Sequence, residues 1–322
     1  MKGILLFLCI VFLLKHKVTD ASLWTEDEQA QSRMYLHGST LGTRKVDTVF
    51  QCYRHCEDNI HCASINMNHA DKTCELKHST KTTHQHKKSD EHHMLYMKVR
   101  DALGSTPRNP ILSCKWFKNI DNQVKSGVYW MKFNEPSSVP FKVFCDMITD
   151  GGGWTLVYSY TFTQYSNFRS LSNAMTPIPN WPLSWSSSSW VPQSTTTPLS
   201  ESSHSAMDFT LWKKIGNEFL VKPNITNWVA CVEGTGSFVN WVSGSLTCRI
   251  VKVMTPTCTN VVPSSFKIIP PNLLVLFTAA RGIYLVLEGR KDSNWPTHDP
   301  CGTNSQNHLT NVQYPGGVWY LR

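Results

Sequence analysis

The chain has 322 residues, which is enough for two domains that each have a hydrophobic core. Its formal net charge of +8 argues against an acidic, calcium-concentrating polyanion and is compatible with weak attraction to anionic glycans or cell surfaces. Eleven of its twelve tryptophans lie after Cys114, and this aromatic content indicates a large, β-rich domain in that part of the chain.

The first 21 residues have the layout of a secretory signal peptide. Lys2 supplies a positive start, Ile4–Leu14 is an unbroken apolar run, and Ala21 offers a small residue for cleavage. A helix of this length spans about 16 Å, too little for a hydrocarbon core of roughly 30 Å, so we do not expect a membrane anchor. We predict secretion, no nucleic-acid partner, and a mature net charge of +6, from 28 Lys and Arg minus 22 Asp and Glu.

Removal of the signal peptide also removes Cys9 and leaves ten cysteines. An even number of cysteines in an exported chain indicates disulfides, here five, because the export route is oxidising. A zinc site would need paired C-x2-C knuckles, which the sequence lacks. We therefore expect a cross-linked framework and no cofactor.

Residues 22–100 predict a small domain with one helix and a hairpin. Apolar residues and cysteines at helical spacing predict a helix that begins at Val49, capped by Asp47 or Thr48. Alternation over residues 63–68 predicts a half-buried strand, with a turn and a second strand through Cys74 after it. The helix then presents two cysteines toward a hairpin that carries two more, within the reach of disulfides.

This region resembles the PAN/apple family. The resemblance rests on the C-x3-C-x5-C-x11-C array, with CASINMN and CELKHS around its last two cysteines, and covers roughly residues 30–100. It implies the pairs Cys52–Cys74 and Cys56–Cys62. It also implies a module that binds proteins or carbohydrates, without naming the ligand.

Histidines crowd the end of this domain, namely His78, His84, His86, His92 and His93. They allow a divalent-metal or pH-responsive site. Because their spacing is irregular, we favour the alternative of a solvated, basic loop between strands.

Residues 101–113 contain one Gly and two Pro and show little apolar periodicity, which predicts a linker. After it, strands are predicted at Ser126–Met131, Pro140–Met147 and Trp154–Val157. Gly151–Gly153 lacks the Lys-Ser/Thr ending of a phosphate-binding loop and predicts a turn with positive φ.

The motifs SGVYWM and PFKVFCDMITDGGGWTLV resemble the start of fibrinogen-like domains, which intelectins share. The resemblance is clear over residues 114–160, and we extend the domain to residue 322. It implies the pair Cys114–Cys145. The acidic calcium loop of the family is not present in its usual form, and no ligand-binding residue carries over.

Beyond the motifs, the last four cysteines allow three pairings, of which we expect Cys231–Cys248 and Cys258–Cys301. Before Cys301, oxygen ligands at a spacing able to hold calcium are offered by Asp292, Asn294, His298 and Asp299. A structural turn at that place is the interpretation that we favour.

Residues 186–205 are rich in Ser, Thr and Pro and predict an exposed loop; near it Trp181, Trp185 and Trp190 suit either sugar stacking or core packing. Asn224-Ile225-Thr226 is a sequon for N-glycosylation. The apolar stretch Leu273–Leu287 is interrupted by Arg281-Gly282 and predicts two buried strands rather than a membrane span.

The sequence therefore predicts an α+β protein, with a small disulfide-stapled module followed by a larger β-rich domain. It lacks the nucleophile and metalloprotease motifs sought, namely Gly-Asp-Ser-Gly, G-x-S-x-G and H-E-x-x-H, so we expect no enzyme. The domain pair is similar to cnidarian extracellular proteins, including components of the skeletal organic matrix of stony corals, which implies a mineral-associated matrix or adhesion role. The competing hypothesis is a soluble, lectin-like recognition protein of innate defence.

Overall fold

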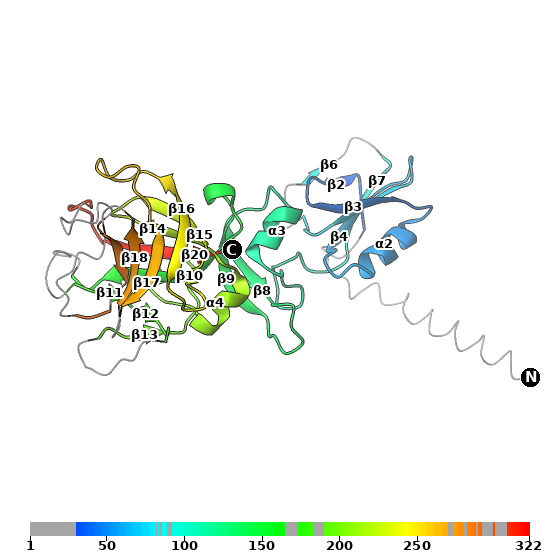
Figure 1. Cartoon of the computed structure of the whole chain (residues 1–322). Coiled ribbons are helices and arrows are strands. Elements are labelled where there is room, and N and C mark those ends of the chain that lie inside the picture. The colour runs from blue at the N-terminus through cyan, green and yellow to red at the C-terminus, as the bar shows by residue number, and fades with distance from the viewer. Residues whose placement is uncertain are drawn as a thin grey trace, which may run out of the picture. The chain divides into compact units, whose positions relative to one another are not determined.

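The computed structural model describes residues 30–81, 83, 86–88, 92–164, 173–182, 190–269, 273–279, 282–287, 289–291, 299 and 308–322. The predicted signal peptide lies outside these residues. The chain divides into two compact units, Met1–Asn109 and Pro110–Arg322, and each is described by itself (Figure 1).

The first unit is a five-stranded antiparallel sheet with one helix, α2 (Val49–Glu57). The strand order is β1-β7-β4-β5-β3, while β2 and β6 pair in a separate two-stranded sheet. The strands are β1 (Gln31–Ser32), β2 (Met34–Leu36), β3 (Thr40–Lys45), β4 (Ser64–Asn68), β5 (Thr73–Lys77), β6 (His86–Lys88) and β7 (Met94–Lys98). A small sheet with one helix agrees with the predicted module.

Helix α2 begins at the predicted residue, and Thr48 is its N-cap. Thr48 Oγ1 accepts a hydrogen bond from Gln51 N at 3.2 Å, and Gln51 Oε1 accepts one from Thr48 N at 3.4 Å. This reciprocal pair is a capping box, which satisfies two backbone donors at the start of the helix. Asp47, the other cap considered, lies outside the helix.

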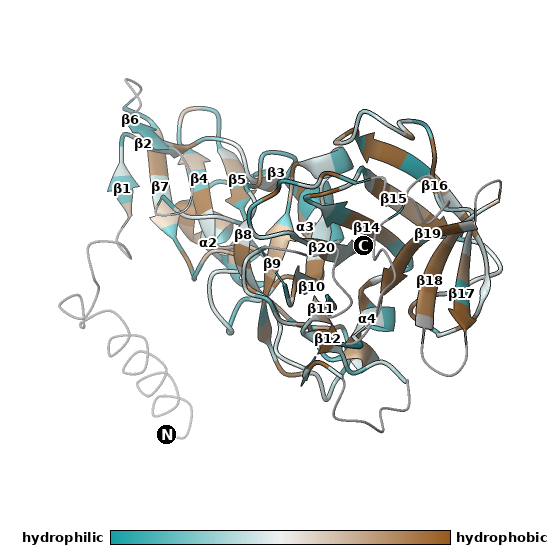
Figure 2. Ribbon diagram, turned by 90° about the vertical axis from the view of Figure 1, so that its left-hand side faces the viewer, coloured by the Kyte–Doolittle hydropathy of each residue, from teal (hydrophilic) through white to brown (hydrophobic). Residues whose placement is uncertain are grey.

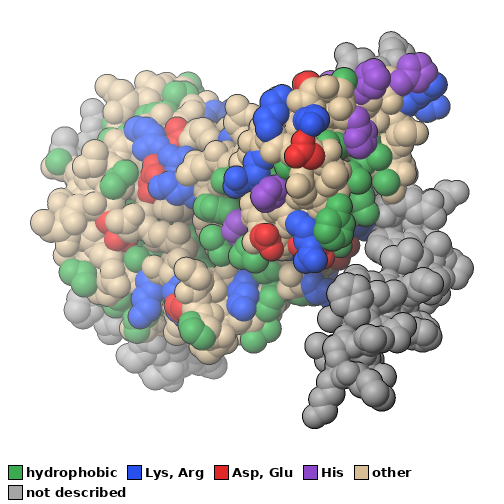
Figure 3. All heavy atoms as spheres, turned by 90° about the vertical axis from the view of Figure 1, so that its right-hand side faces the viewer, with side chains coloured by type: hydrophobic (Ala, Val, Ile, Leu, Met, Phe, Trp, Pro, Cys, Tyr) green, Lys and Arg blue, Asp and Glu red, His purple; other side chains and the backbone are tan. Residues whose placement is uncertain are grey.

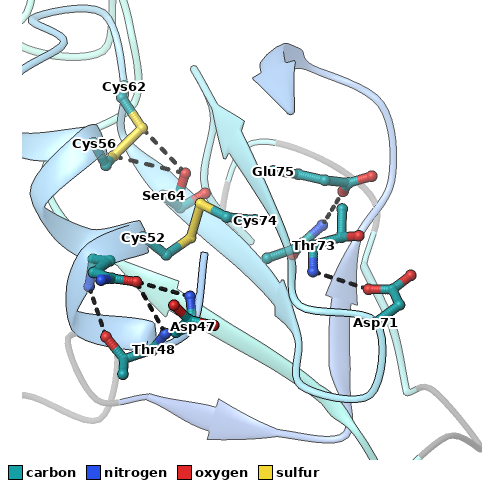
Figure 4. Close-up of a disulfide and its surroundings, with 12 residues drawn as sticks. Asp47, Thr48, Cys52, Cys56, Cys62, Ser64, Asp71, Thr73, Cys74 and Glu75 are labelled. Carbon is teal, nitrogen blue, oxygen red and sulfur yellow. Dashed lines mark hydrogen bonds between the residues drawn. A yellow bond between two sulfur atoms is a disulfide. The ribbon is translucent and has the colours of Figure 1, made fainter. Parts of the chain in front are cut away.

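Two disulfides fix the helix in the first unit (Figure 4). Cys52 is bonded to Cys74 on β5 with a Cα separation of 5.6 Å, and Cys56 to Cys62 with 5.2 Å. These are the pairs that the PAN/apple resemblance implied. All four cysteines are buried in a core cluster that also contains Ile65, Met67 and Leu76.

Strand β4 is buried on both faces, whereas its alternation predicted a half-buried strand. Ser64 and Asn66, expected to face solvent, are 0% and 1% exposed. Asn66 is covered by β2: Leu36 N donates to Asn66 Oδ1 at 3.1 Å, and Asn66 Nδ2 donates to Leu36 O at 2.9 Å. The polar side chain is tolerated inside because it is hydrogen-bonded.

The segment 101–113, predicted as a linker, is packed at both ends. Leu103 is buried, and its backbone N donates to His78 O in the first unit at 2.9 Å. Ile111 is also buried, and its N donates to Trp130 O in the second unit at 2.8 Å. The boundary between the two units, after Asn109, lies within the predicted linker, and backbone hydrogen bonds attach the residues on either side of it to their own units.

The second unit is built on a large sheet of eleven strands among the described residues. The order is β19-β18-β17-β16-β15-β14-β20-β10-β9-β8, and β11 pairs with β10. The strands are β8 (Gly127–Met131), β9 (Phe141–Asp146), β10 (Trp154–Phe162), β11 (Met175–Thr176), β14 (Glu218–Pro223), β15 (Trp228–Glu233), β16 (Gly244–Lys252), β17 (Ser265–Ile269), β18 (Leu273–Thr278), β19 (Gly282–Leu287) and β20 (Gly316–Leu321). Two short strands, β12 (Ile178–Pro179) and β13 (Gln193–Ser194), pair in parallel; the helices are α3 (Cys114–Ile120), α4 (Phe209–Ile215) and the 3-10 turn η1 (Thr149–Gly151).

Strands β10 and β20 occupy the interior of this sheet. All nine residues of β10 are buried, and β20 pairs with β10 on one side and β14 on the other. Their side chains contribute to a core cluster of Trp154, Leu156, Leu220, Ala230, Val318 and Tyr320. Strand β20 therefore connects β10, which the fibrinogen-like motifs include, to β14 and the strands beyond it.

The apolar stretch Leu273–Leu287 forms two strands, as predicted. Strands β18 and β19 pair antiparallel, with Leu276 opposite Leu285, and Figure 2 shows their hydrophobic character. Among the described residues, no helix combines the length and apolar character needed to cross a membrane.

The three glycines form the predicted turn. Gly151, Gly152 and Gly153 have φ values of +85°, +76° and +76°. A Cβ atom at Gly152 would lie 2.2 Å from Met147 O, so the turn requires glycine there for space as well as for conformation.

The disulfide between Cys114 and Cys145 ties the start of α3 to β9, with a Cα separation of 5.6 Å. It is the pair implied by the fibrinogen-like resemblance.

We predict unequal contributions from the two disulfides of the first unit. Replacing Cys52 and Cys74 with alanine opens a loop with a sequence separation of 22 and should lower the free energy of unfolding by about 3 kcal/mol. Replacing Cys56 and Cys62 opens a separation of 6 and should cost about 2 kcal/mol. Urea denaturation of the mature chain measures both. A larger loss from the shorter loop would contradict this expectation.

Candidate functional site

A network of ion pairs holds the glycine turn against the sheet. Arg322, just after β20, donates to the Glu218 carboxylate from Nε at 2.8 Å and Nη2 at 3.0 Å, and its Nη1 donates to Gly152 O at 2.9 Å. Arg249 donates to the same carboxylate at 2.9 Å and also to Asp150. Two guanidinium groups thus share one carboxylate, an arrangement suited to a structural anchor.

A second network surrounds Lys222, a residue that is 9% exposed. Its Nζ donates to Glu201 Oε1 at 2.6 Å and to Asp146 Oδ2 at 3.2 Å, and the Trp228 ring centroid lies 4.7 Å away. Tyr320 OH donates to the same Glu201 oxygen at 2.5 Å, and burial raises the pKa of this phenol well above its usual value. Asp146, the acidic residue of the CDM motif, therefore helps to satisfy a buried cation.

Trp181, expected as a possible sugar contact, is buried. It is 2% exposed, and its ring centroid lies 6.2 Å from Tyr158, 6.3 Å from Phe238 and 5.7 Å from Trp241. The aromatic cluster continues through Phe209, Trp212, Phe219, Phe266 and Trp319. Core packing, the alternative considered for Trp181, is what the structure has.

The 234–243 loop, which joins β15 to β16, lies beside this cluster. A disulfide joins Cys231 and Cys248, which are directly opposite on the two strands, with a Cα separation of 4.0 Å. The ends of the loop approach closely, since a Cβ at Gly236 would lie 2.6 Å from the carbonyl carbon of Gly244. The loop is therefore held at its base by a covalent cross-link and by glycine-dependent packing.

Trp241 is the candidate ligand-contact residue of this loop. Its backbone has a φ of +58°, a left-handed conformation that is unfavourable for a bulky side chain. The half-buried ring packs 5.7 Å from Trp181 and 5.5 Å from Phe209, and the next residue, Val242, is 49% exposed. An indole held in this way offers a fixed apolar surface and an N–H donor, which suits contact with a sugar ring.

Trp241 was not among the residues predicted from the sequence to contact a ligand. The available signal was the run 234–244, in which three glycines enclose Asn240 and Trp241. Glycines on both sides of a short aromatic segment are typical of a tight loop. Hydrophobic periodicity does not show whether the aromatic side chain of such a loop is exposed.

The predicted calcium ligands are not brought together within the described part of the chain. Asp292, Asn294 and His298 lie outside it, as does Cys301. Asp299 is 1% exposed, and its backbone N donates to Tyr284 O at 2.8 Å. No group of three or more His, Cys, Asp or Glu side chains able to hold a metal occurs among the described residues.

The other site predictions fall partly outside the described residues. Cys258 is disulfide-bonded; its expected partner, Cys301, is outside, as is Trp185. Trp190 is half-buried, and most of the Ser-rich segment after it is exposed, as expected for residues 190–205.

Asn224, the glycosylation candidate, is exposed. Its Nδ2 donates to Tyr314 O at 3.0 Å, and its Oδ1 accepts from Gly316 N at 2.9 Å. An attached glycan would therefore extend from the end of β14 into solvent.

The histidines of the first unit are dispersed. His78 is buried, whereas His92 and His93 are exposed. His86 lies on strand β6 rather than in the predicted loop, and His84 lies outside the described residues.

Two parts of the chain match known families. Residues 29–100 match the PAN domain, and residues 114–170 match the C-terminal globular domain of fibrinogen beta and gamma chains. The chain therefore carries a PAN domain followed by a fibrinogen C-terminal-like domain.

A curated relative is similar over a shorter stretch. Echinolectin 1 of Echinometra lucunter is 42% identical over 53 residues, which are 16% of this chain and 21% of the relative. The chain thus matches about a fifth of the relative's length.

The shared carboxylate predicts acid sensitivity of the fibrinogen-like domain. Burial pushes the pKa of Glu218 up, but hydrogen bonds and charges from Arg322 and Arg249 outweigh it and lower the pKa. A carboxyl group whose pKa is lower in the folded state stabilises the fold fully at pH values above its pKa in the unfolded chain, about 4.3. This contribution to the free energy of unfolding is lost as the pH falls through the pKa of the folded state. Glu218→Gln should therefore cost roughly 2 kcal/mol at about pH 7, with the deficit shrinking toward about pH 3.

Thermal unfolding of the mature chain from about pH 7 to about pH 3 measures this difference. The control is Glu135→Gln, which removes a partly exposed pair with Lys214 and should cost under about 1 kcal/mol. A Glu218→Gln deficit that grows on acidification would contradict the assignment.

Proposed function

We propose that this chain is a secreted, non-enzymatic recognition and adhesion protein that binds glycan or protein partners outside the cell. The observation that carries the proposal is Trp241, a half-buried tryptophan with a left-handed backbone on a disulfide-clamped loop. The PAN and fibrinogen-like domains, and the similarity to a lectin, support this class of function.

A glycan is the ligand that the Trp241 loop suits best. A sugar ring has an apolar face that an immobile indole is able to cover, and its hydroxyls need nearby polar groups. Asn240 is exposed beside Trp241, and its Nδ2 donates to Ser237 Oγ at 2.9 Å, which orients the amide. The loop therefore offers one apolar and one polar contact on a framework that needs little ordering on binding.

Two narrower proposals accompany this function. A place in a mineralised skeletal matrix rests on the cnidarian resemblance, and peptides of this chain should then appear in washed, demineralised skeleton. Their repeated absence from that material would reject the matrix role. Calcium dependence rests on Asp292, Asn294 and Asp299, and equal glycan binding with and without EDTA would reject it.

The glycan proposal makes a mutational prediction. The mature chain should show saturable, sugar-competable binding on a glycan array. Trp241→Ala should weaken binding to the best glycan by about tenfold or more, because the substitution removes the apolar contact.

The matched control for this prediction is Trp130→Ala. Trp130 is another half-buried tryptophan of the same domain, on β8, where Lys142 Nζ lies 5.3 Å from its ring centroid. Equal losses in the two variants would show that Trp241 acts through folding rather than contact, and a mature chain that binds no glycan would leave only protein partners.

Secretion makes a separate prediction at Asn224. Chain secreted from eukaryotic cells should lose the mass of one N-glycan on treatment with peptide-N-glycosidase, and Asn224→Gln should abolish that shift. Thr226→Ser preserves the sequon and should retain it. An unchanged mass in the secreted wild-type chain would reject glycosylation at this residue.

A further inference from the structure

The segment 194–206 of the fibrinogen-like domain is a surface loop that is closed at its base. Ser194 Oγ accepts a hydrogen bond from Ala206 N at 3.1 Å and donates to Ala206 O at 3.3 Å. Near the middle of the loop, the Glu201 carboxylate accepts from Lys222 Nζ at 2.6 Å. The loop is therefore attached to the domain at its base and near its middle.

The exposed hydroxyl groups of this loop fall into two sets. Ser200 Oγ lies 3.2 Å from Ser202 Oγ and 3.0 Å from Ser203 Oγ, so these three hydroxyls form one hydrogen-bonded group. Thr195 and Thr196 are also exposed, and neither of their hydroxyls forms a hydrogen bond with another residue that the structure describes. A group attached to either threonine would therefore displace no contact of the hydroxyl within the described part of the chain.

Exposure alone does not distinguish a modified hydroxyl. On the face seen in Figure 3, uncharged polar side chains and backbone, drawn in tan, cover much of the surface. The local sequence supplies a second criterion: Pro198 follows closely after Thr195 and Thr196, and residues 190–200 contain no Asp, Glu, Lys or Arg. Segments rich in Ser, Thr and Pro are the type that carries O-linked glycans.

The backbone around the two threonines suits the groove of a modifying enzyme. Strand β13 ends at Ser194, so Thr195 follows directly on an extended segment. Proline disfavours the helical conformation in the residue before it, here Thr197, and has no backbone N–H of its own to pair. Extended and proline-containing segments are forms in which grooves of other proteins commonly bind a peptide.

We propose that Thr195 and Thr196 are O-glycosylated during export, with an N-acetylhexosamine as the first sugar. In each transfer, threonine Oγ1 forms a bond to C1 of the sugar of a nucleoside-diphosphate donor, and the bond from C1 to the diphosphate breaks. The hydroxyl proton passes to a base of the transferase or to the nucleoside diphosphate that is released. The inference rests on the part of the proposed function that sends the chain through the export route.

A phosphoryl group fits these threonines less well. A phosphoryl group is held in an ordered loop by cationic side chains, and residues 190–200 carry none. The ammonium group of Lys222, which reaches the loop, is already bonded to Glu201 and Asp146. A neutral sugar needs no such partner, and the contacts of Ser194, Glu201 and Ala206 that attach the loop involve neither threonine.

Mass spectrometry of the whole secreted chain tests the proposal. Chain secreted from cultured animal cells is treated with peptide-N-glycosidase, and its intact mass is compared with that of the mature polypeptide. We expect an excess mass of hexosamine-based glycans that sialidase and O-glycosidase reduce. Electron-transfer fragmentation of the peptide that spans residues 192–200 should locate this excess on Thr195 and Thr196.

Thr195→Ala combined with Thr196→Ala should lose the whole excess. The matched control combines Ser202→Ala with Ser203→Ala, which removes two exposed hydroxyls from the same loop and should retain it. Thermal unfolding of the secreted variants checks that both fold.

Three results would overturn the inference: an unmodified 192–200 peptide in the secreted chain, an excess mass that the threonine double variant retains, or an excess that phosphatase rather than glycosidase removes. A secreted chain that binds glycans but has unmodified threonines would remove this site alone. A secreted chain with modified threonines that binds neither glycans nor proteins would remove the recognition function and leave this site.

Discussion

Disulfide cross-links are the constraint on which both domains depend. The PAN domain is small, so its core alone supplies little stability, and two cross-links join its helix to the sheet and to the segment after the helix. In the fibrinogen-like domain, Cys231–Cys248 joins opposite residues of β15 and β16. That bond lies at the base of the 234–243 loop and holds together the two strands that the loop joins. It therefore restrains the loop in which Trp241 has its left-handed backbone. The Cys231–Cys248 bond therefore joins β15 to β16 and also closes the base of the loop that we propose as a ligand contact.

The ionic networks have a different role, because they connect parts of the fibrinogen-like domain that are distant in sequence. Strand β20 inserts between β10 and β14, and Arg322 beyond it reaches both Glu218 and the glycine turn. An oppositely charged partner offsets the desolvation cost of burying each charge. Removing one partner would leave the other charge buried and uncompensated, at the full desolvation cost. These contacts explain why an acidic motif residue such as Asp146 belongs to the framework and need not be assigned to ligand binding.

Local sequence patterns predicted the elements whose signals are local. The stripe from Val49 with Thr48 before it predicted helix α2, and family motifs implied the cysteine pairs of the PAN domain. The patterns were wrong where a second layer intervened: β4 alternates, yet β2 covers its polar face through Asn66. The exposure of a tryptophan is likewise set by tertiary packing, which buries Trp181 and leaves Trp241 partly exposed. No period in the sequence distinguishes those two environments.

A cross-linked framework carries the aromatic loop for which we propose glycan binding. The central claim is that oxidised cysteines hold this framework together. Mass-spectrometric disulfide mapping of the native, non-reduced protein tests it most directly. The account predicts linked peptides for Cys52–Cys74, Cys56–Cys62, Cys114–Cys145 and Cys231–Cys248. Free thiols at these eight positions, or Cys231 and Cys248 bonded to other partners, would contradict it.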